Sequence, residues 1–123
     1  MALIDTAMLR VLSGSLDVNA FRQTVISSNL ANVDTPGYRT RDIDFRRALT
    51  DAVAADGGGD GLGVGLTPVA RKLPGLIERP DGNNVSADRE GLLLAATQLR
   101  FSLSAQLVKN EFHKILLAIR EGA

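Results

Sequence analysis

The sequence predicts a mainly α-helical protein. We expect long N- and C-terminal helices that pack as an α-helical hairpin or coiled coil, joined by an extended arm and a flexible glycine-rich middle. Apolar residues recur at helical spacing near both ends of the chain, over residues 5–33 and 87–121. Between them, the ten residues from Asp56 to Gly65 include six glycines. Such a run loses too much backbone entropy on ordering to form a regular element.

Composition narrows the class of protein. The 123 residues leave room for one modest domain, and with 45% hydrophobic but only 4% aromatic residues the core must be aliphatic. The 14 basic and 14 acidic residues balance to a net charge of +0, which argues against a nucleic-acid partner. The absence of cysteine excludes disulfides and cysteine metal sites. No apolar run approaches the ~20 residues that span a membrane.

The N-terminal helix, predicted over residues 5–33, carries two apolar stripes. One is close to a heptad seam and comprises Met8, Val11, Val18, Phe21 and Val25. The other comprises Leu9, Leu12, Leu16, Ala20, Ile26 and Leu30. Asp5 or Thr6 is suited to cap the start of the helix. Gly14 costs about 1 kcal/mol relative to alanine in a helix interior, so we expect a local weakness there.

A sharp turn follows this helix. In the stretch Ser28-Asn-Leu-Ala-Asn-Val-Asp-Thr-Pro-Gly-Tyr38, Pro36 and Gly37 fit the two central positions of a type II turn. Thr35 precedes proline and is therefore pushed out of the helical region, so the helix ends at or before it. Asn29 and Asn32 lie three apart on the last turn, where either side chain is able to bond unpaired carbonyls.

The middle segment, residues 34–85, holds this turn, an extended arm and the glycine run. The expected arm residues are Arg41, Asp42, Ile43, Asp44 and Phe45. Further on, we expect a short strand or hairpin arm over Leu73 to Arg79 and a turn over Pro80 to Asn83. The segments on either side, residues 1–33 and 86–123, are the two core helices.

The C-terminal helix has the stronger pattern. Spacings of four and three alternate without a break through Leu94, Gln98, Phe101, Ala105, Val108, Phe112, Ile115 and Ile119. Such a heptad seam, sustained for more than three repeats, is typical of a coiled-coil contact. A neighbouring stripe comprises Leu92, Ala96, Leu99 and Leu103.

The ends of this helix are also marked. Ser86 is a good N-cap, and Asp88 and Glu90 lie in the first turn, where the helix dipole favours acidic side chains. Arg120 has the complementary charge near the other end, and Gly122 is suited to close the helix.

Two stripes on each helix have a consequence for assembly. An antiparallel hairpin covers roughly one stripe on each helix, so the other stays exposed, and a long exposed apolar strip marks a partner surface. A flat hairpin of this size is also a marginal monomer, because little area is buried.

No residue pattern indicates catalysis. The only histidine, His113, has no second ligand at helical spacing and is expected at the surface or in an interface. The glycine run lacks the Gly-Lys-Ser/Thr ending of a phosphate loop and the ligand spacing of a calcium loop. No serine is paired with an adjacent base. We therefore expect no catalytic, cofactor-binding or metal site, no small-molecule substrate and no enzymatic activity.

The turn carries a family resemblance. It closely resembles the N-terminal signature S-x-N-x-A-N-x-x-T-P-G-Y of bacterial flagellar axial proteins, the rod and hook family, and every element of that signature is present. The segments Arg41–Phe45, Asp81–Val85 and Gln98–Phe101 are similar to proximal rod subunits of that family. The resemblance covers roughly residues 16–47 and 80–120.

This resemblance implies a structural subunit of the proximal rod, in the periplasmic part of the flagellar basal body. Its terminal helices would pack as a coiled coil around the core of a tube, and its arm would contact neighbouring subunits. The corner between helix and arm would be set by Asn29, Asn32, Thr35, Pro36, Gly37 and Tyr38. The assembly seam would comprise Leu94, Phe101, Val108, Phe112, Ile115 and Ile119.

The resemblance also implies partners and a route. The protein would associate with itself, with other rod subunits, with the adaptor between rod and membrane ring, and with the export gate. No secretory signal peptide is apparent in the sequence, so we expect export through the dedicated flagellar apparatus without a cleaved signal.

Two alternatives stay open. Other proximal rod subunits resemble the turn but usually carry a Ser-Arg-Ala-Tyr-like segment where this chain reads Leu99-Arg-Phe-Ser102. Distal rod and hook proteins carry a large β-rich insert, for which residues 46–85 are too few. A helical-hairpin adaptor or export chaperone in the cytoplasm would use the same apolar stripes, and only the signature turn argues against it.

Overall fold

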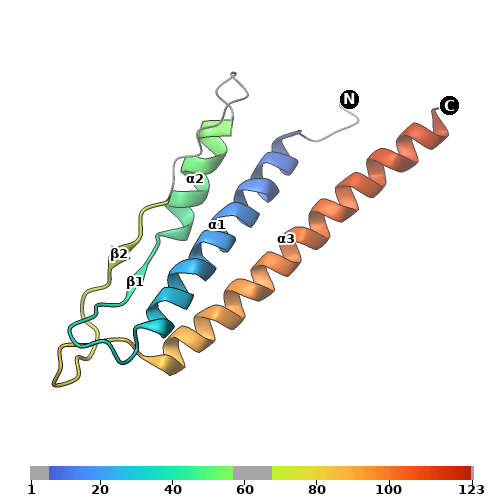
Figure 1. The fold of residues 1–123 in the computed structure, drawn as a ribbon. Coiled ribbons are helices and arrows are strands. Elements are labelled where there is room, and N and C mark those ends of the chain that lie inside the picture. Colours follow the sequence, from blue (N-terminus) through green and yellow to red (C-terminus); the bar gives the residue numbers. More distant parts are fainter. Residues whose placement is uncertain (1–5, 57–67, 123) are drawn as a thin grey trace.

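The computed structural model describes residues 6–56 and 68–122. Its elements, in chain order, are α1 (Thr6–Ala31), β1 (Arg41–Asp42), α2 (Phe45–Asp56), β2 (Arg71–Lys72) and α3 (Ala87–Glu121). α1 lies between α2 and α3, and the chain reverses direction at the lower end of the view, where the turns gather (Figure 1). The predicted mainly helical fold with long terminal helices is confirmed. The glycine run beyond Asp56 lies outside the described residues.

α1 is a continuous helix that ends two residues earlier than residue 33. Asp5, one of the two expected caps, lies outside the described residues. Gly14 is buried where α2 crosses: a Cβ built on it would lie 3.4 Å from Leu49 Cδ1 and 3.6 Å from Ala52 Cβ. A methyl group at this position would be in ordinary contact with α2, so the packing leaves room for a residue as small as alanine.

α2 was missed by the sequence analysis, which assigned residues 46–56 to the arm and the flexible middle. The Asp44 side chain accepts a hydrogen bond from the backbone N–H of Arg47 at 3.2 Å, as an N-cap does. Phe45, Ala48 and Ala52 follow at helical spacing and join the core that α2 shares with α1. Leu49 and Val53 follow the same spacing, so the apolar periodicity of this helix is present in the sequence and was overlooked.

The arm forms a short antiparallel ladder, in which Arg41 pairs with Lys72 and Asp42 with Arg71. The strand expected over Leu73 to Arg79 was therefore misplaced. Pro74 has no N–H to donate, and Gly75 takes a φ of +79°, so the chain bends away from the ladder. The turn expected at Pro80 to Asn83 is confirmed, because the Gly82 N–H donates to the Arg79 carbonyl at 2.9 Å.

The capping residues of α3 are where the sequence places them. The Ser86 side chain accepts from the Arg89 N–H, Asp88 and Glu90 lie in the first turn and Arg120 in the last. Gly122 is the C-cap, but its φ of −84° shows that the helix ends there without a left-handed residue. At 1.5 Å per residue, the 35-residue helix is about 52 Å long.

Both stripes of α1 are covered over much of their length, contrary to the expectation from a simple hairpin, although Met8 and Val11 near the start of the helix are exposed. Val18 and Val25 pack with Ile43 of the arm and Ala48 of α2 in the main core cluster. Leu12 and Ile26 of the second stripe are buried as well. For α3 the expectation holds, since one of its faces stays exposed.

Among the described residues, no helix has the length and apolar character needed to cross a bilayer.

Candidate functional site

The signature turn has the predicted geometry. The Tyr38 N–H donates to the Thr35 carbonyl at 3.2 Å, which closes a four-residue turn around Pro36 and Gly37. Gly37 takes a φ of +76°, the positive value that a type II turn requires at this position. The turn directs the chain from the end of α1 into the arm.

Asn29 joins three segments of the chain at this corner. Its fully buried side chain donates to the Arg41 carbonyl at 2.7 Å and to Glu90 Oε2 at 3.1 Å. Its Oδ1 accepts from the Arg41 N–H and from the Tyr38 hydroxyl, each at 3.1 Å. The side chain thus holds β1, the turn and α3 rather than the carbonyls at the end of its own helix.

Asn32 makes the contact with a carbonyl at the helix end that was expected of either Asn29 or Asn32. Its side-chain amide donates to the Ser28 carbonyl at 2.8 Å, within the last turn of α1. Its Oδ1 accepts from the Thr35 hydroxyl at 3.0 Å. Asn32 and Thr35 therefore shape the helix end locally, whereas Asn29 works across the fold.

Glu90 is the buried centre of the corner, at 1% exposure. Its Oε1 accepts from the Thr40 hydroxyl at 2.7 Å and from the Arg89 guanidinium at 3.1 Å. The Thr40 backbone N–H in turn donates to Asn84 Oδ1 at 2.7 Å. A buried carboxylate is tolerated when its oxygens are hydrogen-bonded and its charge is paired, and both conditions hold here.

Asn83 closes the C-terminal end of α1 from a distance in sequence. Its side-chain amide lies within hydrogen-bonding distance of three carbonyls, those of Asn32 (2.9 Å), Val33 (3.1 Å) and Thr35 (2.8 Å). These carbonyls follow the last helical turn, where no intrahelical donor is available. Asn83 is also fully buried, and its Oδ1 accepts from the Val85 N–H at 2.8 Å.

The sequence analysis missed Thr40, Asn83, Asn84 and Glu90 as corner residues. It treated Asn83 only as a turn former and Glu90 only as a dipole partner of its helix. The one sequence feature that pointed to Asn83 and Asn84 was the family resemblance over Asp81–Val85. That segment contains polar residues that belong to no apolar pattern. Contacts that join residues 50 or 61 positions apart leave no local pattern.

The expected arm residues are brought onto α1 and α2. Arg22 of α1 binds Asp42 with two hydrogen bonds, at 3.0 Å and 2.8 Å. Ile43 is buried in the core and Asp44 caps α2. The Arg100 guanidinium of α3 lies 5.6 Å from the centre of the Phe45 ring. The side chain of Arg41 is exposed.

The predicted seam on α3 divides between two environments. Leu94, Val108 and Ile115 are half-buried, whereas Phe101, Phe112 and Ile119 are 38%, 55% and 65% exposed. The buried residues of the helix are instead Glu90, Thr97 and Ser104, spaced by seven. The Ser104 hydroxyl meets that of Ser15 at 3.0 Å, so the face toward α1 is centred on this polar line.

The other face of α3 carries a long apolar strip. Leu92, Leu99, Leu103 and Leu116 are each more than half exposed, with Leu92 at 74% and Leu99 at 72%. Leu107, at 40% exposure, continues the line of Leu92, Leu99 and Leu103, whereas Phe112 and Ile119 belong to the predicted seam on another flank of the helix. α3 lies at the outer edge of the three-helix layer (Figure 1), so no other described element covers this strip.

The described residues hold no group of three or more potential metal ligands among histidine, cysteine and the acidic residues. His113 is exposed, as expected. The arrangement at the corner fixes the direction of a chain segment, and the arrangement on α3 offers an apolar surface.

Comparison with known proteins agrees with these features. A family model described as flagella basal body rod protein matches residues 9–39, which comprise most of α1 and the signature turn. The flagellar basal body rod protein FlgB of Yersinia enterocolitica is 32% identical over 130 residues, covering 93% of this chain and 94% of the relative. FlgB of Escherichia coli K12 is 32% identical, covering 94% and 95%. FlgB of Borrelia hermsii is 31% identical, covering 85% and 90%.

These relatives extend the likeness from the signature to the arm, the corner and α3. The chain belongs to the family of the flagellar basal body rod protein FlgB and is a structural subunit of the bacterial flagellar rod.

Proposed function

We propose that this protein forms part of the proximal rod and packs against neighbouring subunits through the uncovered face of α3. The observation that carries the proposal is the apolar strip of α3, which runs from Leu92 through Leu99 and Leu103 to Leu107 and is covered by no other described element. Patches of this extent on soluble proteins mark interaction surfaces. The strip follows a straight helix, which suits lateral packing of helices in a tube.

The magnitude of the burial supports this role. Fully burying one large aliphatic or aromatic side chain contributes about 1.5–3 kcal/mol. Four exposed leucines, together with Phe112 and Ile119, supply several such contributions for each subunit. The half-buried seam residues Leu94, Val108 and Ile115 border the face toward α1 and would take part from one side.

The corner has a separate role in the proposal. The hydrogen bonds of Asn29 and Glu90 fix the arm relative to both long helices, so that every subunit presents its arm at the same angle. Removing one member of a buried, paired carboxylate site typically costs about 3–5 kcal/mol. A helical tube needs equivalent contacts between successive subunits, which a rigid corner provides.

The finer partners belong to the same proposal. On the strength of the family resemblance, the subunit meets other rod proteins on one side, and the adaptor at the membrane ring and the export gate on the other. It leaves the cytoplasm without cleavage of a signal peptide and takes part in no catalytic step.

Substitution on the strip tests the role of α3. In a strain that lacks the protein, we expect a Leu99→Asn/Leu103→Asn variant to restore far fewer basal bodies than the unchanged chain, counted by electron microscopy. Ser102→Asn, on an exposed residue of the same helix, is the matched control. Circular dichroism should show equal helix content for all three proteins, because the strip makes no contact within the subunit.

Normal numbers of basal bodies with the double variant would contradict the proposed surface. The same strains test the alternative of a cytoplasmic adaptor or chaperone by fractionation. The proposal requires the protein in purified basal bodies, whereas recovery from the cytoplasm alone would favour a chaperone.

A further inference from the structure

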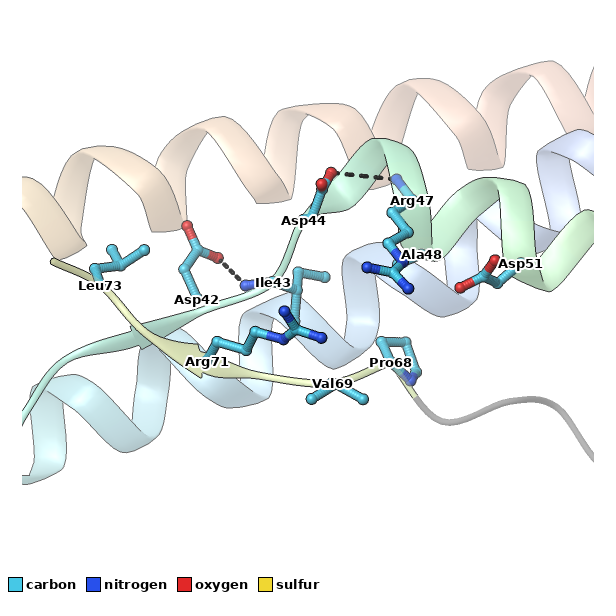
Figure 2. A pocket seen from close by; sticks show the side chains of 10 residues that line it. All are labelled: Asp42, Ile43, Asp44, Arg47, Ala48, Asp51, Pro68, Val69, Arg71 and Leu73. Atoms are coloured by element: carbon cyan, nitrogen blue, oxygen red, sulfur yellow. Dashed lines mark hydrogen bonds between the residues drawn. The ribbon is translucent and has the colours of Figure 1, made fainter.

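A pocket of about 420 Å³ lies between the start of α2 and the segment that leads into β2. Figure 2 shows Ile43, Ala48, Val69 and Leu73 around this space, with the guanidinium groups of Arg47 and Arg71 beside them. The volume falls in the range of sites that enclose small organic groups. The lining therefore combines apolar side chains with guanidinium and carboxylate groups (Figure 2).

The charged side chains that line the pocket include both acidic and basic residues. Asp44 and Asp51 line the pocket together with the two arginines, and the fifth charged residue, Asp42, is already paired with Arg22. Neither Arg47 nor Arg71 forms an ion pair among the described residues. Because two carboxylates offset two guanidinium groups, the pocket has no net attraction for a simple anion such as phosphate. An apolar group flanked by charges of both signs fits it better.

The chain itself presents such a group at a different place. Ile77 is 93% exposed, the largest value among the exposed large hydrophobic residues of the described chain. It is followed by Glu78 and Arg79, which carry charges of both signs. Single exposed apolar residues are ordinary in soluble proteins, but the position of this one is held firmly.

The residues after Ile77 are fixed to the signature corner. Glu78 forms an ion pair with Arg39. The Arg79 N–H donates to the Asn83 carbonyl at 2.8 Å, and its guanidinium donates to the Val33 carbonyl. On the other side, Gly75 bends the chain with a φ of +79°. The isoleucine is therefore presented on an ordered segment and would lose little conformational entropy on binding.

We propose that Ile77 of one copy inserts into the α2–β2 pocket of the next copy along the rod. Ile77 does not line the pocket of its own chain. The isoleucine and the pocket are therefore separate surfaces, and the isoleucine of one copy is free to bind the pocket of another. Such a contact is heterologous: it repeats with a fixed translation and rotation and generates an open helical array. The proposal rests on the proposed function and adds a contact between arms to the packing of α3.

Cysteine pairs test this contact directly, because the natural chain contains no cysteine. In basal bodies from cells that carry the Ile77→Cys/Val69→Cys variant, mild oxidation should yield disulfide-linked dimers and higher oligomers of this chain. Val69 is a suitable position because it lines the pocket and is 65% exposed. Each single variant should yield no such series. An Ile77→Cys/Asp88→Cys variant, with its second cysteine at an exposed position of α3 that does not line the pocket, is the control for random collision.

Absence of oligomers in basal bodies that hold normal amounts of the double variant would overturn the contact and leave the proposed function intact. The contact would also be overturned if the cysteine at position 77 formed a disulfide only with a cysteine placed in a different rod protein, and never with a second copy of this chain. If the unchanged chain itself were absent from basal bodies, the proposed function and this contact would fail together.

A second variant removes the dependence on disulfide geometry. Ile77→Asp should lower incorporation into basal bodies by about tenfold, since the apolar contact is lost and a charge is buried. Ile77→Leu, which keeps an aliphatic side chain, should restore most of it. Equal incorporation of the aspartate and leucine variants would contradict the contact.

Discussion

Single polar side chains at the corner each hold several segments together. Asn29 contacts the arm, the turn and α3, and Asn83 contacts three carbonyls that follow α1. Both side chains are fully buried. Because a buried amide has two donors and one acceptor oxygen to satisfy, no smaller or apolar residue reproduces these contacts. Substitutions at the corner that keep the shape of a side chain but alter its hydrogen bonds should therefore lower the free energy of unfolding strongly.

Asn83→Asp is such a change. It replaces the donating amide by a carboxylate that faces three carbonyls, so we expect a loss of at least about 2 kcal/mol in the free energy of unfolding. Urea unfolding followed by circular dichroism measures it. Asn110→Asp, at an exposed position of α3, should change the free energy by less than about 0.5 kcal/mol. Equal effects of the two changes would mean that Asn83 does not close α1.

Gly37 is required for its backbone conformation rather than for space. A Cβ built on Gly37 meets no atom within 4 Å, but its φ is +76°. Gly37→Val should thus cost about 1–3 kcal/mol through strain, whereas Gly37→Asn should cost less because asparagine tolerates this region. Thermal unfolding of both variants, together with the motility they restore, provides the comparison. A valine variant as stable as the asparagine variant would refute the turn assignment.

Gly14 offers the opposite case. The nearest atoms to a Cβ at this position, at 3.4–3.6 Å, leave room for a methyl group in ordinary contact with α2. Since alanine is favoured over glycine in a helix by about 1 kcal/mol, Gly14→Ala should raise the melting temperature. Gly14→Leu should lower it by displacing α2 from α1. A lower melting temperature for the alanine variant would show that α2 packs more tightly than the structure indicates.

Among the elements, the contact between α1 and α3 is organised by polar residues. Glu90, Thr97 and Ser104 recur every seven residues on α3, and two of them pair with Asn29 and Ser15 of α1. From the first pair to the second, the residue number falls by 14 on α1, from 29 to 15, and rises by 14 on α3, from 90 to 104. The two pairs therefore share one antiparallel register. Buried polar pairs are known to select one register of a helix pair.

Thr97 is the exception in this line, since its buried hydroxyl has no hydrogen-bond partner. Thr97→Val keeps the shape and removes an unsatisfied polar group, so we expect it to be neutral or to stabilise the protein by up to about 1 kcal/mol. Ser104→Val should destabilise it, because the Ser15 hydroxyl then keeps only the 3.3 Å hydrogen bond that it accepts from Asn19. Denaturant unfolding of the two variants tests the assignment, and a marked loss of stability in the threonine variant would contradict it.

The elements show which features a sequence reveals. Both long helices, the caps of α3 and the Pro36-Gly37 turn follow from local propensity and spacing, and all were predicted. α2 was missed although Phe45, Ala48, Leu49, Ala52 and Val53 recur at helical spacing, because the segment was assigned to the arm and to the glycine-rich middle on either side of it. The polar line of α3 was passed over because the apolar residues beside it set the predicted seam. Glu90 and Asn83 take their roles from partners distant in the sequence, which no local pattern indicates.

At the scale of the whole molecule, α1 packs against the arm, α2 and α3, whereas α3 is covered on one side only. The subunit thus consists of a small core and one long helix with an exposed apolar face. This asymmetry is the physical reason to expect a marginally stable subunit that gains stability on assembly. The braced corner and the strip of α3 then serve one purpose, which is to place a helix and an arm at a fixed angle in a tube.

The most direct test of this account measures the exposure of the strip before and after assembly. A Leu99→Cys variant would carry the only cysteine of the chain, at a position that is 72% exposed in the isolated subunit. The account predicts rapid labelling by a maleimide in the purified protein and strong protection in intact basal bodies, with labelling restored when the rods are dissociated. Equally rapid labelling in intact rods would show that the face of α3 is not the assembly surface.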